Sequence, residues 1–325
     1  MIKNNQNKFL YLTILILLFG LISGCSSDDR EIVVVDIHSG NGKVEIEFIE
    51  NLPPSKAYAS EELQIGFKAI NYGAYEVKNG IISLVGDPGY LFFEDGLTSE
   101  EEITDLTAKS NYDPRDTEQF FIFDAKTAFP DKGFSEHESV LYVNYCYDYE
   151  NVFNDQICVD PDQYNLKPVD NKVCQVSESS YSGQGGPVGI SSITPKMILR
   201  DDDIYPQFRI HIRNFGTGQI FSTGQSDIFC GSESINRDFM NSIKIDKIEF
   251  SDMTLEDFDC FPDINDVVIR DREADIICTL KEGSSKRLRS IDEAYTTNLN
   301  IEFKYGYSES VSKTITLINQ NDMIR

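Results

Sequence analysis

The chain has 325 residues, with 54 acidic side chains against 29 basic ones and a formal net charge of −25. Such an acidic chain repels the phosphates of nucleic acids and the head groups of anionic lipids, so we expect no nucleic-acid partner. The part beyond a cleaved leader, about 300 residues, is long enough for two domains of ordinary size.

The N-terminus carries the parts of an export signal in order. Lys3 and Lys8 are basic, residues 9–22 are almost entirely apolar, and small residues precede Cys25. An apolar run of this length is short for a membrane-spanning helix and typical of a signal peptide. The end of the run, ISGC at residues 22–25, resembles the lipobox of prokaryotic lipoproteins, in which the peptidase cuts before the cysteine and its sulfur carries a diacylglycerol.

This resemblance predicts a lipoprotein signal peptide over residues 1–24, lipidation of Cys25, and a polar tether over residues 25–42. The competing interpretation is an uncleaved N-terminal anchor with an incidental cysteine. Both interpretations place the remainder of the chain outside the cytoplasm, attached to the membrane or cell surface at one end. No later apolar run in the sequence is long enough to cross a bilayer.

Residues 43–181 contain a series of predicted short strands. VEIEF at 44–48 alternates apolar and charged residues, which is the period of a half-buried strand. Ser99-x-x-Glu102 is a capping box ahead of Ile103 and predicts a single short helix between strands. The other strand-like runs lie at 63–69, 81–85, 90–93, 120–123 and 139–149.

A glycine-rich segment, SGQGGP at residues 182–187, is the predicted linker between two domains. Two blocks of short strands separated by turns predict an all-β fold, with tandem immunoglobulin-like β-sandwich domains over residues 43–181 and 188–325. The strand-like runs of the second block lie at 188–193, 208–212, 243–250, 274–280, 295–305 and 311–317.

The two blocks also echo each other. FKAINYG at residues 67–73 is matched by IHIRNFG at residues 210–216, and both are alternating strands that end in Asn-aromatic-Gly. Their position early in each block favours a duplicated module.

Six cysteines remain once Cys25 is assigned to lipid, and an even number in an exported chain indicates disulfides. Cys146 and Cys158 flank residues 151–154 almost symmetrically, so a hairpin turn there would place them opposite each other. The same argument applies to the segment centred near residue 269. Zinc is the competing interpretation, but there is no C-x-x-C and no nearby histidine pair. The predicted disulfides are Cys146–Cys158, Cys260–Cys278 and Cys174–Cys230.

The alternating strands that end in Asn-aromatic-Gly resemble the immunoglobulin-like, cell-adhesion-related (CARDB-like) modules of bacterial and archaeal surface proteins. Further segments are similar to a group of exported archaeal proteins: VNYCYDY at 143–149, CVDP at 158–161, GQGGPV at 183–188, DCFP at 259–262 and YGY at 305–307. The resemblance covers most of the mature chain. It implies a surface β-sandwich protein and no catalytic residue.

The sequence shows no catalytic constellation. A hydrolytic triad needs a base beside its nucleophile, and only three histidines occur. His38 lies in the predicted tether, His137 in the polar run SEHE, and His211 on the outward face of a predicted strand. There is no G-x-S-x-G motif. We therefore expect a protein that is not an enzyme.

Binding sites for small ligands have weak signals. Asp160-x-Asp162 and the DDD run at 201–203 could offer oxygens to calcium, but acidic runs are ordinarily solvated turns. The glycines at 183–186 lack the Lys-Ser/Thr of a phosphate loop. We predict no metal site and no cofactor. For the tyrosines between Tyr142 and Tyr149, we prefer sandwich core and strand edge over a binding face.

These observations predict a cell-surface, lipid-anchored structural or adhesive interaction module without catalysis. Its partners would be the membrane, through the lipid, and another surface protein or a second copy, contacted through loops or exposed strand edges. The alternative is a solute- or polymer-binding lipoprotein that serves a transporter, which would need a concave pocket with convergent polar groups.

Overall fold

The computed structural model describes residues 36–94, 96–129, 134–166, 172–231, 236–286, 288–289 and 293–319. The described residues belong to one compact unit. The predicted signal peptide and Cys25 lie outside the described residues. No helix among the described residues is long and apolar enough to span a bilayer.

The described residues form three sheets. The four-stranded sheet has the order β1 (Val44–Phe48), β3 (Glu62–Asn71), β7 (Thr117–Thr127) and β5 (Leu91–Phe93). The six-stranded sheet has the order β15 (Phe258–Phe261), β17 (Glu273–Leu280), β11 (Asp203–Asn214), β10 (Val188–Arg200) and β9 (Ser179–Ser180), with β18 (Leu288–Arg289) beside β11.

The nine-stranded sheet has the order β14 (Met253–Thr254), β13 (Ser242–Phe250), β19 (Tyr295–Ile318), β8 (Glu136–Val159), β4 (Lys78–Val85) and β6 (Thr98–Ile103). Three short strands complete it: β12 (Gln219–Phe221) and β2 (Lys56–Tyr58) pair with β19, and β16 (Val267–Val268) pairs with β13. The helical pieces among the described residues are α2 (Ser226–Cys230), η1 (Arg237–Phe239) and η2 (Leu255–Asp257).

Apolar side chains of the smaller sheets pack against the nine-stranded sheet, which confirms the predicted all-β sandwich class. Phe67 of β3 is fully buried in one core together with Val143 of β8. Phe208 of β11 meets Phe250 of β13 with ring centroids 4.8 Å apart. The alternation read from the sequence therefore places its apolar residues between two sheet layers.

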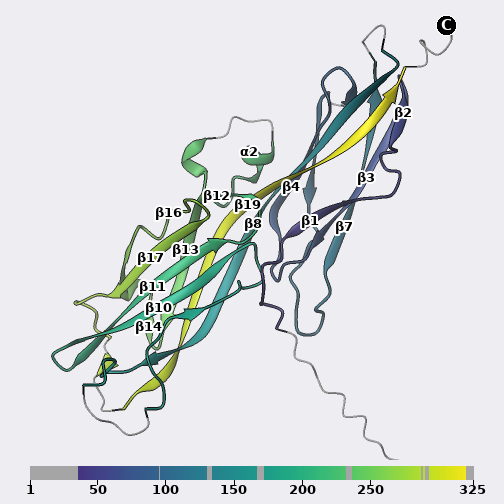
Figure 1. The fold of residues 1–325 in the computed structure, drawn as a ribbon. Coiled ribbons are helices and arrows are strands. Elements are labelled where there is room, and N and C mark those ends of the chain that lie inside the picture. The colour runs from purple at the N-terminus through teal and green to yellow at the C-terminus, as the bar shows by residue number, and fades with distance from the viewer. Residues whose placement is uncertain are drawn as a thin grey trace, which may run out of the picture. The chain divides into compact units, whose positions relative to one another are not determined.

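The four-stranded sheet belongs to one half of this arrangement and the six-stranded sheet to the other half. Two strands of the nine-stranded sheet run through both halves. β8 and β19 pair antiparallel over all 24 residues of each, without a register shift. At about 3.4 Å per residue such a ribbon is roughly 80 Å long. β4 joins it at residues 142–148 and β13 at residues 299–304. Figure 1 shows the two long strands side by side, in teal and yellow.

The predicted domain boundary at residues 182–187 stays a prediction. The segment is also bonded into the centre of the structure. Gly185 donates its N–H to the Gly40 carbonyl at 2.7 Å, and its own carbonyl accepts from the Ala74 N–H at 2.7 Å. It therefore does more than join two parts of the chain.

The unbroken course of β8 makes the predicted Cys146–Cys158 disulfide wrong. Residues 151–154, where we expected a hairpin turn, lie inside the strand. The two cysteines are therefore separated by about 40 Å of extended chain. Alternation alone could not show whether two apolar runs were two short strands or one long strand.

The remaining predicted disulfides have mixed outcomes. The predicted Cys174–Cys230 pair is wrong. Cys230 on α2 bonds Cys146 of β8, and Cys174 bonds Cys158 at the end of the same strand. The third pair joins the neighbouring strands β15 and β17 as predicted. The disulfides of the structure are Cys146–Cys230, Cys158–Cys174 and Cys260–Cys278.

The predicted helix at Ser99 to Glu102 is wrong as well. These residues belong to β6, which pairs with β4 at the margin of the nine-stranded sheet. The three glutamates at 100–102 are exposed, while Ile103 is buried. Pairing with a neighbouring strand overrides the local capping signal here.

The echoing segments of the sequence occupy equivalent places. Val44 of β1 stands opposite Asn71 of β3, and Val188 of β10 stands opposite Asn214 of β11. Each asparagine donates from its side chain to the carbonyl four residues later, at 2.7 Å for Asn71 and 2.9 Å for Asn214. The two halves thus repeat one local design around the centre of the β8–β19 ribbon.

The glycines of the two echoes are required by close approach. A Cβ at Gly73 would overlap the hydroxyl oxygen of Tyr149, and a Cβ at Gly216 would overlap that of Tyr307. Both tyrosines lie near the centre of the ribbon. No residue but glycine fits at either position without a shift of the tyrosine.

We expect Gly73→Ala to lower the free energy of unfolding by about 2 to 3 kcal/mol, since the new methyl group displaces the Tyr149 hydroxyl. Urea denaturation with intact disulfides measures this. Adding Tyr149→Phe should recover part of the loss, because it removes the overlapping oxygen. Gly283→Ala, at a position with open space around it, is the control. Equal effects at Gly73 and Gly283 would contradict the close approach.

Candidate functional site

A groove of about 740 Å³ lies beside the centre of the β8–β19 ribbon. Lys43 and Glu45 line it from the β1 side, Tyr145 of β8 and Glu309 of β19 from the ribbon, and Thr217 from the loop after β11. Charged, hydroxyl and aromatic groups from separate segments converge here. This makes the groove the candidate site.

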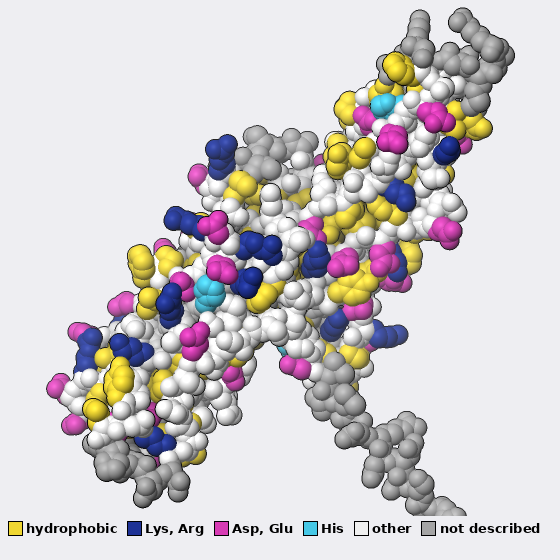
Figure 2. All heavy atoms as spheres, viewed as in Figure 1, with side chains coloured by type: hydrophobic (Ala, Val, Ile, Leu, Met, Phe, Trp, Pro, Cys, Tyr) yellow, Lys and Arg dark blue, Asp and Glu magenta, His cyan; other side chains and the backbone are white. Residues whose placement is uncertain are grey.

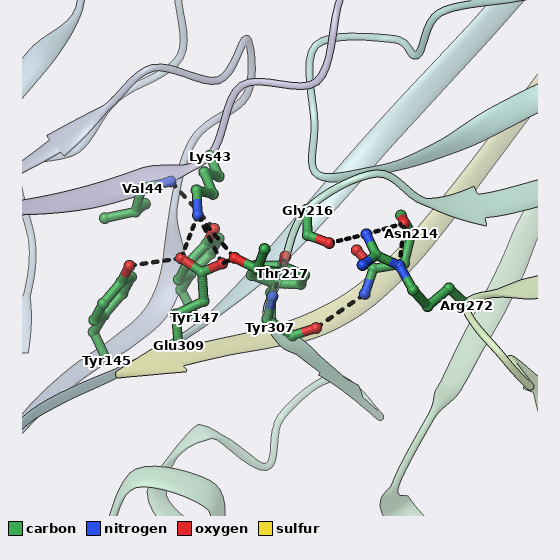
Figure 3. A network of polar contacts seen from close by, with 11 residues as sticks. Lys43, Val44, Tyr145, Tyr147, Asn214, Gly216, Thr217, Arg272, Tyr307 and Glu309 are labelled. Carbon is green, nitrogen blue, oxygen red and sulfur yellow. Dashed lines mark hydrogen bonds and ion pairs between the residues drawn. The ribbon is translucent and has the colours of Figure 1, made fainter. Parts of the chain in front are cut away.

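The Glu309 carboxylate is the centre of a polar network (Figure 3). Lys43 Nζ lies 2.7 Å from both of its oxygens, and the hydroxyls of Thr217 and Tyr145 each donate to it at 2.7 Å. The Glu309 side chain is only 8 % exposed, so these donors replace the water that it has lost. The network joins the start of β1 and the loop after β11 to both ribbon strands.

The network keeps Glu309 ionised. Burial raises the pKa of this carboxyl, but hydrogen bonds from Lys43, Thr217 and Tyr145 outweigh burial and hold the pKa below its ordinary value. Burial and the neighbouring carboxylate together raise the pKa of Tyr145 far above its ordinary value. Tyr145 is therefore a permanent donor, and Glu309 an acceptor already engaged by three groups.

Four buried tyrosines continue the network along the ribbon, with Tyr147 opposite Tyr307 and Tyr149 opposite Tyr305. Burial raises the pKa of all four above the ordinary value, so their hydroxyls stay protonated. Each hydroxyl accepts a backbone N–H from a smaller sheet or its loops: Val44 to Tyr147 at 3.2 Å, Tyr75 to Tyr149 at 3.1 Å, Val188 to Tyr305 at 3.3 Å and Gly218 to Tyr307 at 2.8 Å.

These contacts confirm the interpretation of Tyr145, Tyr147 and Tyr149 as core. Tyr145, Tyr147 and Tyr149 are at most 2 % exposed, whereas Tyr142 is 48 % exposed. The inward tyrosines share odd positions of one strand, and Tyr142 has an even position, so it points to the opposite face.

Arg272 fixes the Asn-aromatic-Gly turn at the end of β11 (Figure 3). Its guanidinium donates to the Asn214 carbonyl at 2.9 and 3.2 Å, and to the Gly216 carbonyl. Gly216 in turn packs against Tyr307. The arginine therefore holds the loop in the position from which Gly218 bonds the ribbon.

None of the three histidines lines the groove. His211 faces outward, with Nδ1 3.0 Å from Asp275 Oδ1 on the neighbouring strand β17. His137 is less free than its polar surroundings in the sequence suggested, since Nε2 lies 3.0 Å from Asp87 Oδ2 and its ring stacks on Tyr90 at 3.5 Å. The His38 ring lies 5.2 Å from that of Tyr75.

The acidic pair weighed as a calcium ligand set is bound by a lysine. Lys172 Nζ lies 2.8 Å from Asp160 Oδ2 and 4.0 Å from Asp162 Oδ2. The Asp160 side chain is 2 % exposed, and the ammonium supplies the positive charge that such burial needs. Among the described residues, no group of three or more His, Cys, Asp or Glu side chains has a metal-binding arrangement.

Sequence reasoning did not single out Lys43, Thr217 or Glu309. One signal was available for Glu309. It follows Tyr305 and Tyr307 at the same parity of an alternating strand, so it had to point inward. An inward carboxylate requires a partner, but the sequence does not name Lys43, which precedes it by 266 residues.

Comparisons with known proteins leave the family open. No family model and no curated protein matches the chain. Among solved structures, the CupB6 tip adhesin from Pseudomonas aeruginosa aligns with 86 % of this chain and 98 % of its own, at 8 % identity and a TM-score of 0.17. A TM-score this low carries no argument. The resemblance to CARDB-like archaeal surface proteins stays a prediction.

We expect Glu309→Gln to lower the free energy of unfolding at neutral pH by about 2 kcal/mol, because it removes a buried charge that three donors satisfy and leaves Lys43 unpaired. The folded pKa of Glu309 lies below its ordinary, unfolded value. Its contribution is therefore complete above the unfolded pKa and is lost as the pH falls through the folded pKa.

Urea denaturation of both proteins between acid and neutral pH checks this: the difference between wild type and Glu309→Gln should shrink as the pH falls. The control is Glu62→Gln, which breaks an ion pair with Lys126 whose two side chains are 78 % and 72 % exposed. It should have no measurable effect. A difference for Glu309→Gln that stays constant with pH would contradict the electrostatic account.

Proposed function

We propose that the chain is a lipid-anchored structural or adhesive interaction module that acts outside the cytoplasm and without catalysis. The β8–β19 ribbon is the observation that supports this most. Tandem domains in a chain are ordinarily joined by one linker. Here 24 consecutive residue pairs run through both halves, so a load on one half reaches the other through paired strands.

Three further features support a load-bearing or displayed protein. Three disulfides join segments of the described chain, which is typical of exported proteins. The convergent polar groups of the groove are engaged in holding β1, the ribbon and the loop after β11 together. On the face in view in Figure 2, acidic and basic side chains are interspersed with small hydrophobic areas.

The alternative function is a solute- or polymer-binding lipoprotein that serves a transporter. The groove of about 740 Å³ favours it, because Lys43, Tyr145 and Glu309 converge there. We place it second because the Glu309 carboxylate already has three donors from the chain itself. A ligand would have to displace one of them.

Lipidation of Cys25 has a direct test. We expect the wild-type protein to incorporate labelled palmitate and to sediment with membranes, and Cys25→Ala to lose both properties, since the thioether is the anchor. Ser26→Ala is the matched control and should behave like wild type. If the wild-type protein keeps its leader and incorporates no palmitate, the N-terminus is an uncleaved anchor instead.

The interaction role is tested by cross-linking and mass spectrometry on intact cells that express the tagged full-length protein. We expect reproducible links to another surface protein or to a second copy. Links confined to transporter subunits would replace the proposal with the solute-binding alternative. A matched strain that expresses Cys25→Ala shows which links depend on anchoring.

A further inference from the structure

The β19 strand has an open stretch on one side. Its pairing with β12 covers residues 306–308, and its parallel pairing with β2 begins at Thr316. In the described part of the chain, residues 309–315 therefore have a strand neighbour only on the β8 side. The N–H of Thr316 points to the β2 side, and this direction recurs at every second residue. The backbone groups aimed at the open side are those of Ser310, Ser312 and Thr314.

β1 borders the same groove with a free edge of its own. Its odd-numbered residues bond the β3 side, since the carbonyl of Lys43, just before β1, accepts from the residue after β3, and the N–H of Ile49, just after β1, donates to β3. Ile46 therefore directs its N–H and C=O away from β3. Ile46 lines the groove together with Ser310 and Val311, so two strand edges meet in one groove.

The other half of the structure has the equivalent edges, and there the chain covers them. β10 takes the place of β1, and the Gln184 side chain makes the two hydrogen bonds that a neighbouring strand would make with it. Its amide donates to the Ile190 carbonyl at 3.0 Å and accepts from the Ile190 N–H at 2.7 Å. β9 pairs with Ser192 and Ile193 of the same edge. The segment before β10 thus covers this edge, with β9 as a paired strand and Gln184 through its side chain.

The equivalent part of β8 is covered by two tyrosines. The Tyr75 hydroxyl donates to the Val152 carbonyl at 3.1 Å and accepts from the Val152 N–H at 3.0 Å. Tyr181 packs on Phe153, with ring centroids 4.8 Å apart. These contacts satisfy the strand edge and bury its inward aromatic residue, which is 2 % exposed.

In the half that contains β1, no described residue makes the equivalent of either set of contacts. The position equivalent to Tyr75 is Gly218, which also bonds a ribbon tyrosine through its N–H but has no side chain to reach Ser310. No side chain among the described residues bonds the outward backbone groups of Ser310. Val311, the counterpart of Phe153, is only partly buried. One half thus has strand edges that the chain itself covers, and in the other half no described segment covers the equivalent edges.

We propose that the edges of β19 (residues 309–315) and β1 form an acceptor groove for one extended strand of another protein, with alternating apolar and basic residues. Alternate side chains of that strand would lie on Ile46 and Val311, which requires apolar residues. The others would face solvent beside exposed Ser312, where the chain's net charge of −25 favours lysine or arginine. This inference deepens the proposed function and rests on it for its biological setting.

The probe is a fluorescein-labelled peptide, KVTVKVTVK, titrated into the full-length protein in detergent and followed by fluorescence anisotropy. Its control is the same peptide with methylated backbone nitrogens at alternate residues, which cannot pair as a strand. We expect the control to bind at least about tenfold more weakly. Hydrogen exchange with saturating peptide should protect the amides of Ser310, Ser312 and Thr314.

Two proline variants test whether the peptide binds at the open edge of β19. Ser312→Pro removes an N–H that faces the groove and not β8, and should weaken binding at least about tenfold. Asn154→Pro, at the equivalent position of β8 in the other half, should bind like wild type. Equal binding of both peptides, no peptide binding, or no protection of the three amides would overturn the acceptor groove. None of these outcomes bears on the intact-cell links that test the proposed function, so the two can fail separately.

Discussion

The antiparallel pairing of β8 with β19 is the constraint on which the other elements depend. Its central tyrosines are buried, and each needs a partner for its hydroxyl. Backbone N–H groups at Val44, Tyr75, Val188 and Gly218 meet that need, so the smaller sheets are positioned by the ribbon. Phenylalanine at these sites would fill the same volume but leave four buried N–H groups without acceptors.

The ribbon also explains why the two halves repeat one design and yet differ. Asn151 of β8 and Glu309 of β19 occupy equivalent positions. Asn151 accepts from Tyr305 at 3.0 Å and donates to the Val188 carbonyl at 2.7 Å, whereas Glu309 binds Lys43. The halves differ in the same way at another pair of equivalent positions, which are Tyr75 in one half and Gly218 in the other. The half that contains β10 is closed by its own chain, and the half that contains β1 keeps an open edge.

Much of the β content could be predicted because alternation depends only on which side chains avoid water. Residues 44–48 and 243–250 alternate in the sequence, and strands occupy both places. The echo at Asn71 and Asn214 was visible for a similar reason, since turns restrict residue types locally. The candidate site was harder to predict because Lys43, Thr217 and Glu309 are far apart in the chain, and no local rule selects one lysine for one glutamate.

By itself, the sequence determined the all-β class, the acidic surface and the pairing of Cys260 with Cys278, because each depends on local pattern or composition. Tertiary structure decided that β8 runs on through residues 151–154, and with it the partners of Cys146 and Cys158. Tertiary structure also decided that the predicted capping box at Ser99 belongs to the strand β6. In each case a strand neighbour distant in sequence supplied hydrogen bonds that outweighed the local signal, and only the folded chain brings that neighbour near.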